Sequence, residues 1–347
     1  MISGASLGAE AMFDCDVVVI GSGGGGAPAT YELARAGLTV ICLEAGPLVK
    51  PEDFTQRKLE TIQRVYVDRG AQGTADGSLQ LLQGRCVGGS TVINGEVCFR
   101  TPDAVLEEWS TRYFVGGMSP TDMAPVFDEV ERMINVTVNE GRYLDAGTRP
   151  AEGLRALGID PKPISRNVKD CRGCCYCFFG CAYGCKQSMD QSYLPAALRA
   201  SARVIHDAEV ERLERDGNRV TGVVARTPAG TLRIASRAVV LACGAVQTPL
   251  ILLDHGIGGD QVGHHLAVHP VLFATGLHDE DKPARVSTML ATYSDHWVDE
   301  GFLVELGSGS NAFAAQGAPG IGRAHKELAR QAQKLWSGGA VVRDLAA

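Results

Sequence analysis

Two stretches of this sequence carry glycines and small polar residues in spacings that suit a bound dinucleotide. The first, Cys15 to Glu44, reads CDVVVIGSGGGGAPATYELARAGLTVICLE, in which Gly21, Gly23 and Gly26 match G-x-G-x-x-G. The first glycine permits a tight turn, the second lets a pyrophosphate approach the backbone, and the third lets helix and strand pack closely. Glu44 closes the stretch, where a carboxylate can accept hydrogen bonds from ribose hydroxyls and disfavours the 2′-phosphate of NADP. The pattern predicts a dinucleotide site and leaves NAD and FAD open.

The elements around these glycines must position them. The apolar run Cys15–Ile20 predicts a buried parallel strand, and Leu38–Leu43 predicts a second one. Between them we expect a helix that continues through Tyr31–Ala36 and ends at Gly37. The unpaired N–H groups and the dipole at the start of this helix would form an anion site.

The second stretch, Leu81 to Arg100, reads LLQGRCVGGSTVINGEVCFR. Its glycines, Gly84, Gly88 and Gly89 among them, leave a backbone that can lie against a flat ring, and its small polar side chains can bind a ligand. A helix is disfavoured here, because each interior glycine costs up to about 1 kcal/mol relative to alanine. Taken alone, the stretch fits a glycine-rich turn and a ligand-binding loop equally well.

Six of the 11 cysteines crowd into CRGCCYCFFGCAYGC, between Cys171 and Cys185. Such dense thiolates are soft ligands that suit iron–sulfur clusters or zinc, but the spacing matches neither a zinc ribbon nor the common ferredoxin run. We expect a reduced structural loop and no metal.

The segment GHHLAVHP contains three histidines, His264, His265 and His269. Their spacing matches no established metal site, so we expect them to pack against other residues or to lie beside the cofactor.

Charge and hydropathy narrow the functional class. The formal net charge is −7, and Lys and Arg do not cluster, which argues against a nucleic-acid partner. No apolar run approaches the roughly 20 residues of a membrane span. The N-terminal segment lacks a basic region followed by an apolar one, so we expect no secretory signal and a cytoplasmic protein.

Both glycine-rich stretches resemble the glucose–methanol–choline (GMC) oxidoreductases, whose members bind FAD. In that family the second stretch lies over the isoalloxazine and pyrophosphate, and a later segment returns to the flavin. The resemblance therefore implies FAD rather than NAD, and it implies a set of cofactor-binding residues. That set is Gly21, Gly23, Gly26, Glu44, Arg85, Gly88, Gly89, Ser90, Thr91, Asn94, Val210, Cys243, Gly244 and Ala245.

The resemblance also implies a reaction. Family members oxidise the CH–OH group of an alcohol: a histidine base takes the hydroxyl proton and a hydride passes to the flavin. That histidine lies near the C-terminus of family members, and nothing here matches its context, so no residue is assigned as catalytic. His325 is expected to be a solvated helix residue.

The cysteine loop is similar to the CxxGCxxGxKxS segment of the branch that contains cholesterol-oxidase-like and long-chain-alcohol-oxidising enzymes, which implies a bulky or apolar alcohol as substrate. One subgroup, the catalytic subunits of flavin glucose dehydrogenases, holds an iron–sulfur cluster at the positions of Cys171, Cys177 and Cys181. Arg172 replaces that subgroup's second, adjacent cysteine, although Cys174 or Cys175 could take its place. We expect a reduced structural loop, with an iron–sulfur cluster as the less favoured alternative.

The expected fold is α/β: a doubly wound, Rossmann-like FAD domain with an inserted helical and loop segment and an incomplete α+β substrate domain. The predicted division is 12–110 and 199–268 for the FAD domain, 111–198 for the insertion and 269–347 for the substrate domain. Within these we expect helices over 56–69, 119–136 and 187–200 and from Thr248, and strands over 204–213, 220–226, 232–235 and 238–242.

Because the catalytic segment has no counterpart, we expect a C-terminally truncated member of the family. The alternatives are a non-catalytic flavin-binding fragment, or one part of a split enzyme that a partner chain completes, in which an iron–sulfur cluster in the cysteine loop would transfer electrons.

Overall fold

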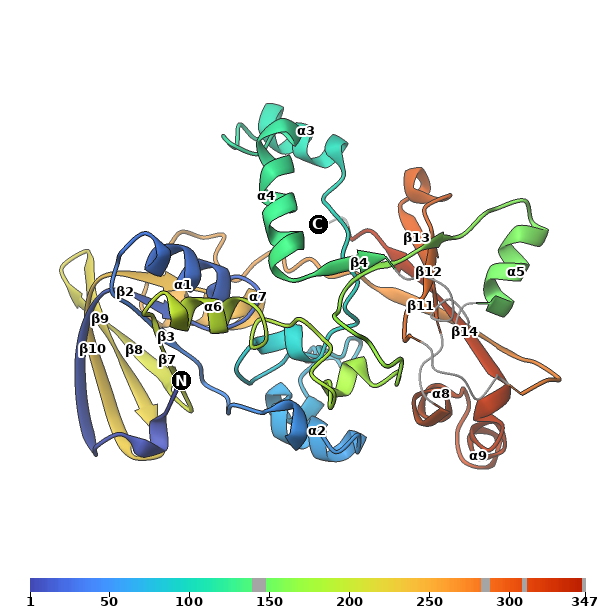
Figure 1. Cartoon of the computed structure of the whole chain (residues 1–347), viewed down its shortest axis with the longest axis horizontal. Helices are drawn as coiled ribbons and strands as arrows, with labels where there is room; N and C mark the ends of the chain where they lie inside the picture. The colour runs from blue at the N-terminus through green and yellow to red at the C-terminus, as the bar shows by residue number, and fades with distance from the viewer. Residues whose placement is uncertain (139–147, 282–287, 308–310, 345–347) are drawn as a thin grey trace. The chain divides into compact units, whose positions relative to one another are not determined.

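The glycine turn follows a central strand of the sheet in the first of two units (Figure 1). The computed structural model describes residues 1–138, 148–281, 288–307 and 311–344. Unit 1 comprises Met1–Asn94 and Phe178–Leu266, and unit 2 comprises Gly95–Cys177 and the described part of Ala267–Ala346. The predicted four-part division into functional domains stays a prediction.

Unit 1 is built on a seven-stranded sheet in the order β1-β7-β3-β2-β10-β9-β8. Its parallel part consists of β1 (Ile2–Ser3), β7 (Arg203–His206), β3 (Val40–Leu43), β2 (Glu10–Ile20) and β10 (Gly230–Leu241). The antiparallel strands β9 (Arg219–Thr227) and β8 (Glu209–Asp216) extend it. Strand residues such as Val18 and Ile41 are almost fully buried, as a covered parallel sheet requires. The predicted doubly wound α/β fold is confirmed.

Three helices accompany this sheet: α1 (Gly26–Arg35), α6 (Tyr193–Arg199) and α7 (Gly244–Asp254). Helix α1 packs against α6, and Figure 1 shows the two side by side. Gly37 adopts a φ of +88°, a conformation that glycine adopts easily just after a helix. Unit 1 also contains α2 (Lys58–Val65) and the 3₁₀ turns η1 (Gly4–Ser6), η2 (Pro51–Asp53), η3 (Val67–Gly70) and η4 (Gly89–Val92).

Several element boundaries differ from the prediction for local reasons. The run 204–213 is not one strand: Asp207, with a φ of +54°, separates β7 from β8, and the two strands take distant places in the sheet. Conversely, the runs 232–235 and 238–242 form the single strand β10, since its backbone pairs with β2 along most of its length. The helix predicted over 56–69 shortens to α2, after which Asp68 and Arg69 adopt positive φ angles.

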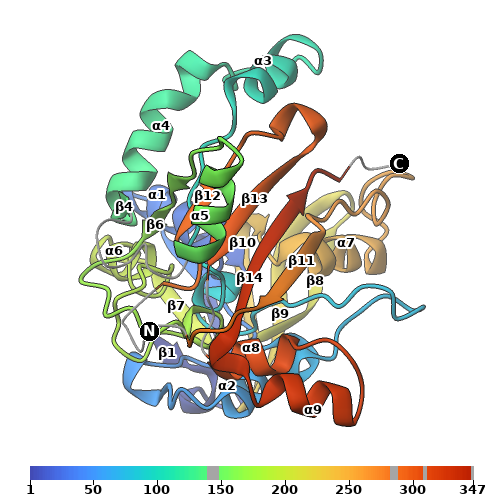
Figure 2. The same cartoon turned by 90° about the vertical axis from the view of Figure 1, so that its right-hand side faces the viewer.

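Unit 2 contains a five-stranded antiparallel sheet in the order β11-β14-β13-β12-β5, and Figure 2 shows its three long strands running side by side. Its strands are β11 (Val271–Leu277), β14 (Leu335–Val342), β13 (Phe302–Gly307), β12 (Thr292–Ser294) and β5 (Lys162–Pro163). A smaller ribbon pairs β4 (Val136–Val138) with β6 (Ser165–Asn167). The remaining elements are α3 (Asp103–Thr111), α4 (Pro120–Met133), α5 (Thr148–Ala156), α8 (Asn311–Gly317), α9 (Arg323–Ala329), η6 (Cys177–Phe179, which runs into unit 1), η7 (Val298–Glu300) and η8 (Ala332–Lys334).

Helix α4 begins as the sequence predicts. The Ser119 hydroxyl accepts a hydrogen bond from the backbone N–H of Asp122, which satisfies one of the unpaired amides of the first turn.

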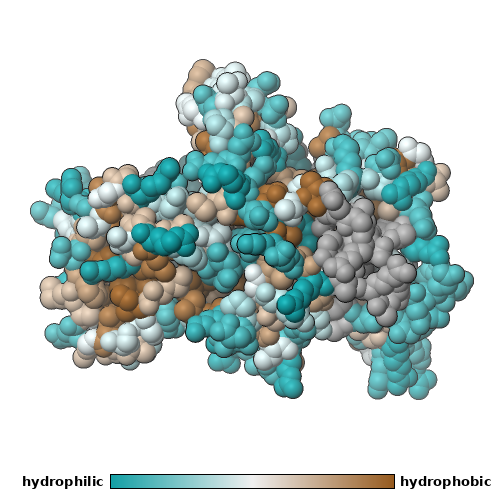
Figure 3. All heavy atoms as spheres, in the orientation of Figure 1, coloured by the Kyte–Doolittle hydropathy of each residue, from teal (hydrophilic) through white to brown (hydrophobic). Residues whose placement is uncertain are grey.

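On the face shown in Figure 3, apolar side chains gather over the β8–β10 part of unit 1. Among the described residues, no helix is both long enough and apolar enough to cross a membrane.

Candidate functional site

The carboxyl ends of the parallel strands of unit 1 open onto one large cavity of about 1630 Å³. This is the edge at which open α/β sheets bind their ligands. The predicted residues lie in three walls: the turn after β2 with the end of β3, the segment around residues 83–94, and β8 with the start of α7. Residues 63–64 and 66–69 line the cavity as well. All the residues predicted to bind the cofactor except Gly26 and Gly88 line the cavity: Gly21, Gly23, Glu44, Arg85, Gly89, Ser90, Thr91, Asn94, Val210, Cys243, Gly244 and Ala245.

The three motif glycines of the turn differ in what surrounds them. A Cβ on Gly21 would lie 2.3 Å from the carbonyl oxygen of Ala242, and its φ is +99°. A Cβ on Gly26 would lie 1.8 Å from the carbonyl oxygen of Gly21, so only glycine lets α1 begin this close to β2. At Gly23 the nearest atom, the Gly89 Cα, would be 3.8 Å away. Gly23 therefore has no close neighbour and lines the cavity, where a pyrophosphate could approach the backbone.

Glu44 lies directly after β3 and is 7% exposed. One of its oxygens accepts hydrogen bonds from the Ser22 hydroxyl at 2.6 Å and the Ser22 N–H at 3.1 Å, and the other accepts the Gly46 N–H at 2.9 Å. Burial raises the pKa of this carboxyl, although these hydrogen bonds oppose the shift. A carboxylate can accept about four hydrogen bonds, so Glu44 retains capacity for a ribose hydroxyl.

Ser22 is a residue of this site that the sequence analysis missed. It is fully buried, and its hydroxyl oxygen accepts the Gly88 N–H at 3.0 Å while its hydrogen goes to Glu44. Ser22 thus joins the glycine turn, the acidic residue and the second glycine-rich stretch. Its position as a free "x" in G-x-G-x-x-G carried no signal, since the pattern constrains only the glycines.

The second glycine-rich stretch is a tightly turned loop with one short 3₁₀ turn, η4. Gly88 and Gly89 have φ angles of +94° and +56°. The Thr91 hydroxyl donates to the Gly88 carbonyl at 2.6 Å and accepts the Met189 N–H at 3.1 Å. The Ser90 hydroxyl accepts the Gly84 N–H at 2.9 Å. The small polar residues therefore hold the loop itself as well as lining the cavity.

Lys186 anchors the same loop from behind. Its side chain is 1% exposed, and its ammonium donates to the carbonyl oxygens of Val92 at 3.0 Å and Asn94 at 2.8 Å. A buried cation needs such polar partners to offset its lost hydration. Lys186 is the lysine of the segment that is similar to CxxGCxxGxKxS, and that resemblance implied no role for it.

The third wall joins β8 to α7. Arg85 forms an ion pair with Glu209 at 3.1 Å, and burial raises the pKa of Cys243 to about 11, so that this thiol stays neutral. His255, also missed from the sequence, ties the two elements together: its Nε2 accepts the Leu213 N–H at 2.9 Å. Its Nδ1 lies 2.8 Å from the Ile251 carbonyl, to which it donates in this arrangement.

The cysteine loop lies across the boundary between the units, with Cys171 and Cys177 in unit 2 and Cys181 in unit 1. All 11 cysteines are free thiols. Within the described residues, no group of three or more His, Cys, Asp or Glu side chains has an arrangement that could hold a metal ion. Of the histidines, His265 contacts the Gln261 side chain at 2.9 Å and His325 contacts the Ala318 carbonyl at 2.7 Å.

Known proteins resemble the chain over most of its length. The family model described as GMC oxidoreductase matches residues 62–271, and an FAD binding domain model matches residues 16–50. An uncharacterized GMC-type oxidoreductase of Mycobacterium tuberculosis is 36% identical over 337 residues, which are 95% of this chain and 53% of that protein. The long-chain-alcohol oxidase FAO4B of Arabidopsis thaliana is 32% identical over 77% of this chain and 37% of its own length. The chain spans about half the length, or less, of these curated relatives.

Solved structures share the fold. Pyridoxine 4-oxidase from Mesorbium loti superposes with a TM-score of 0.68 at 15% identity, covering 94% of this chain and 71% of the other. A variant formate oxidase of Aspergillus oryzae RIB40 superposes with a TM-score of 0.67 at 14% identity, covering 96% and 74%. At such low identity these superpositions show a common fold and nothing more.

Proposed function

Because this chain belongs to the GMC oxidoreductase family, we propose that it serves the FAD-dependent oxidation of a CH–OH group in a bulky or apolar alcohol. Family membership confirms the resemblance seen in the two glycine-rich stretches. The match to an FAD binding domain confirms FAD as the cofactor rather than NAD.

The observation that carries the proposal is the convergence of the predicted residues on one cavity. Gly23 lines the cavity just before the start of α1, where unpaired N–H groups attract a pyrophosphate. Glu44 lies across the same cavity with acceptor capacity for a ribose. The loop that begins at Gly89 lines the same cavity and supplies the small polar side chains of Ser90, Thr91 and Asn94. These features fit a bound FAD, which supplies a two-electron acceptor for the hydride of the alcohol.

The chain's own contribution is to hold and orient the cofactor. In this proposal Ser22 keeps the glycine turn and the loop in fixed relation through its bonds to Glu44 and Gly88. Lys186 keeps the loop carbonyls of Val92 and Asn94 turned toward itself. The general base that accepts the hydroxyl proton is assigned to no residue of this chain.

The substrate class rests on relatives. Four long-chain-alcohol oxidases of Arabidopsis thaliana are 28–32% identical to this chain, which supports an apolar alcohol as the donor. Eleven free thiols support a reducing compartment such as the cytoplasm. An iron–sulfur cluster is not part of the proposal, because the thiols of Cys171 and Cys177 both contact the guanidinium of Arg166.

An anaerobic spectroscopic titration tests the proposal. The purified chain is loaded with FAD, freed of excess cofactor, and titrated with long-chain primary alcohols while the flavin absorbance is followed. Bleaching of the bound flavin is the expected result. A bound flavin that no alcohol bleaches would instead favour the alternative of a flavin-binding part that a partner chain must complete. A chain that retains no FAD would overturn the proposal.

A further inference from the structure

Unit 2 contains a buried arginine that the cofactor cavity does not use. Arg166, on β6, is 1% exposed and forms an ion pair with the buried carboxylate of Glu96. Burial lowers the pKa of this guanidinium, but the charge of Glu96 and the neighbouring thiols outweigh it, so the group stays protonated. A charged group this deeply buried is retained only with close polar partners.

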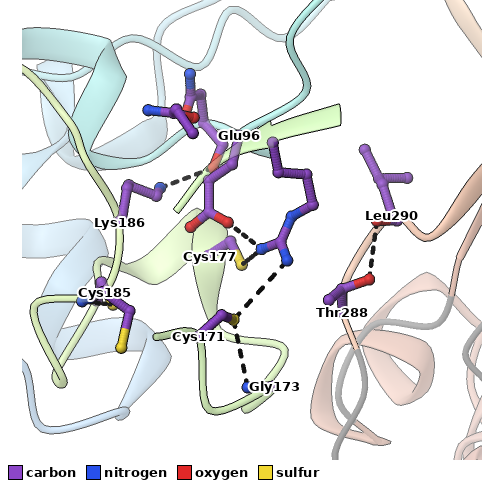
Figure 4. A network of polar contacts seen from close by, with 12 residues as sticks. Glu96, Cys171, Gly173, Cys177, Cys185, Lys186, Thr288 and Leu290 are labelled. Carbon is purple, nitrogen blue, oxygen red and sulfur yellow. Dashed lines mark hydrogen bonds and ion pairs between the residues drawn. The ribbon is translucent and has the colours of Figure 1, made fainter. Parts of the chain in front are cut away.

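Two of those partners are cysteines of the dense loop. Arg166 Nη1 lies 3.8 Å from the sulfur of Cys171, and Nη2 lies 3.6 Å from the sulfur of Cys177. Figure 4 shows both cysteine sulfurs joined by dashed lines to the one guanidinium. The backbone between them reverses at Gly173 and Cys175, whose φ angles are +66° and +58°. This reversal brings two cysteines that are distant in the loop to one cation.

The two sulfurs differ in their access to solvent. Cys171 is half-buried and accepts a further N–H, from Gly173 at 3.4 Å, whereas Cys177 is 8% exposed. The N–H of Gly173 and the guanidinium of Arg166 hold the Cys171 sulfur in place from two sides. The arrangement therefore combines an accessible sulfur with a second sulfur behind it, as in a peroxide-reactive thiol beside a resolving thiol.

We propose that Cys171 and Cys177 form a modification site for hydrogen peroxide, in which Cys171 is oxidised first and Cys177 resolves it to a disulfide. The Cys171 sulfur attacks one peroxide oxygen; the O–O bond breaks, and the thiol proton leaves with the other oxygen as water. The Cys177 sulfur then attacks the resulting sulfenic acid; the S–O bond breaks, and the second thiol proton leaves with the hydroxyl as water. Two thiols and one peroxide thus give one disulfide and two waters.

Glu96 has a defined part in this site. Once the sulfurs form a disulfide, they no longer offer negative charge to the guanidinium. The carboxylate keeps Arg166 paired in both redox states, so oxidation leaves no isolated buried cation. The inference uses unit 2 alone and does not depend on whether the chain binds FAD or oxidises an alcohol.

Peptide mapping of the full chain tests the site. Cleavage after Lys169, Arg172 and Lys186 places Cys171 in residues 170–172 and Cys177 in residues 173–186, so the disulfide would link two peptides. After reaction with one equivalent of hydrogen peroxide, blocking of remaining thiols and digestion, we expect this linked pair, and we expect reductant to separate it. Failure of the pair to form while Cys171 stays alkylatable would overturn the inference.

Single variants identify the resolving thiol. Cys171→Ser and Cys177→Ser should each abolish the linked pair, whereas Cys174→Ser, a change in the same loop, should leave it. A pair that persists in Cys177→Ser would overturn the assignment. Arg166→Lys, which keeps the charge but loses the two-pronged contact, should slow oxidation of Cys171 several-fold. If that variant does not fold, the serine variants still decide the matter.

Discussion

The glycine turn of unit 1 and the cysteine loop both looked rich in chemistry, but their structures differ in kind. The glycines determine the backbone path of the turn, because Gly21 and Gly26 lie where a Cβ would collide with a carbonyl oxygen. The cysteines determine only which atoms are available. Where their sulfurs point was decided by a turned backbone and by Arg166, which lies before the loop in the sequence. The spacing of residues in the sequence predicts a site well when those residues limit the conformation of the main chain. It predicts a site poorly when the residues only supply side chains that could bind a ligand.

The largest effect is expected from the arginine of unit 2. Arg166→Met should lower the free energy of unfolding by about 3–5 kcal/mol, because it leaves the Glu96 carboxylate buried without its cation. Chemical denaturation measures this change. The double variant Arg166→Met with Glu96→Leu should recover part of the loss.

The exposed pair of Arg35 and Glu32 is the matched control. Both side chains are about half exposed, so Arg35→Ala should change the stability by no more than about 1 kcal/mol. If Arg166→Met and Arg35→Ala lowered the free energy of unfolding equally, burial would not explain the difference expected between the two ion pairs.

The next effect concerns the glycine turn. Gly26→Ala places a methyl group 1.8 Å from the Gly21 carbonyl oxygen, so the start of α1 must shift. We expect a loss of about 1–3 kcal/mol or more in the free energy of unfolding, together with much weaker FAD binding. Gly25→Ala is the control, since no atom lies within 4 Å of the added methyl group and its φ is −92°. Because Gly25 lines the cavity, the two variants are compared by stability without FAD, and equal losses would contradict the role given to Gly26.

Variants of Lys186 test whether the loop around residues 83–94 must be anchored for the chain to bind FAD. Lys186→Met removes the donor shared by the carbonyls of Val92 and Asn94, which should cost about 1–3 kcal/mol of stability. FAD affinity, followed by flavin fluorescence, should also fall, because the loop loses its anchor. Lys186→Arg retains the charge and should lose less of both. An unchanged affinity in Lys186→Met would show that the loop is positioned without it.

The smallest effect is a pH dependence at Glu44. Burial raises the pKa of this carboxyl in the folded chain above its ordinary 4.5. The stability contributed by the bound proton is therefore fully present below pH 4.5 and is lost as pH rises through the higher, folded-state value. Without FAD, the wild type should thus lose stability relative to Glu44→Gln as pH rises from about 4.5 toward neutrality. Paired denaturation curves at several pH values measure this difference, and a constant difference would contradict the expectation.

Features formed by residues close together in the sequence could be predicted, whereas features formed by distant residues could not. The strand–turn–helix–strand unit and its acidic residue could be predicted because contiguous residues and hydrogen bonds between neighbouring elements form it. The split of 204–213 into β7 and β8 could not, since apolar periodicity does not reveal a turn at Asp207. Ser22, Lys186 and His255 were missed for a related reason: each acts through a partner far away in the chain.

By itself, the sequence determined the α/β fold, the FAD family and a set of cofactor-binding residues of which all but Gly26 and Gly88 line the cavity. Glycine spacing and β-branched runs limit the backbone before any tertiary contact forms. Only the tertiary structure decided which buried groups pair. Ser22 with Glu44 and Gly88, Lys186 with the loop carbonyls, and Arg166 with Glu96, Cys171 and Cys177 are examples. Such pairing follows from burial, because a polar group removed from water must find its partner wherever the fold brings one close.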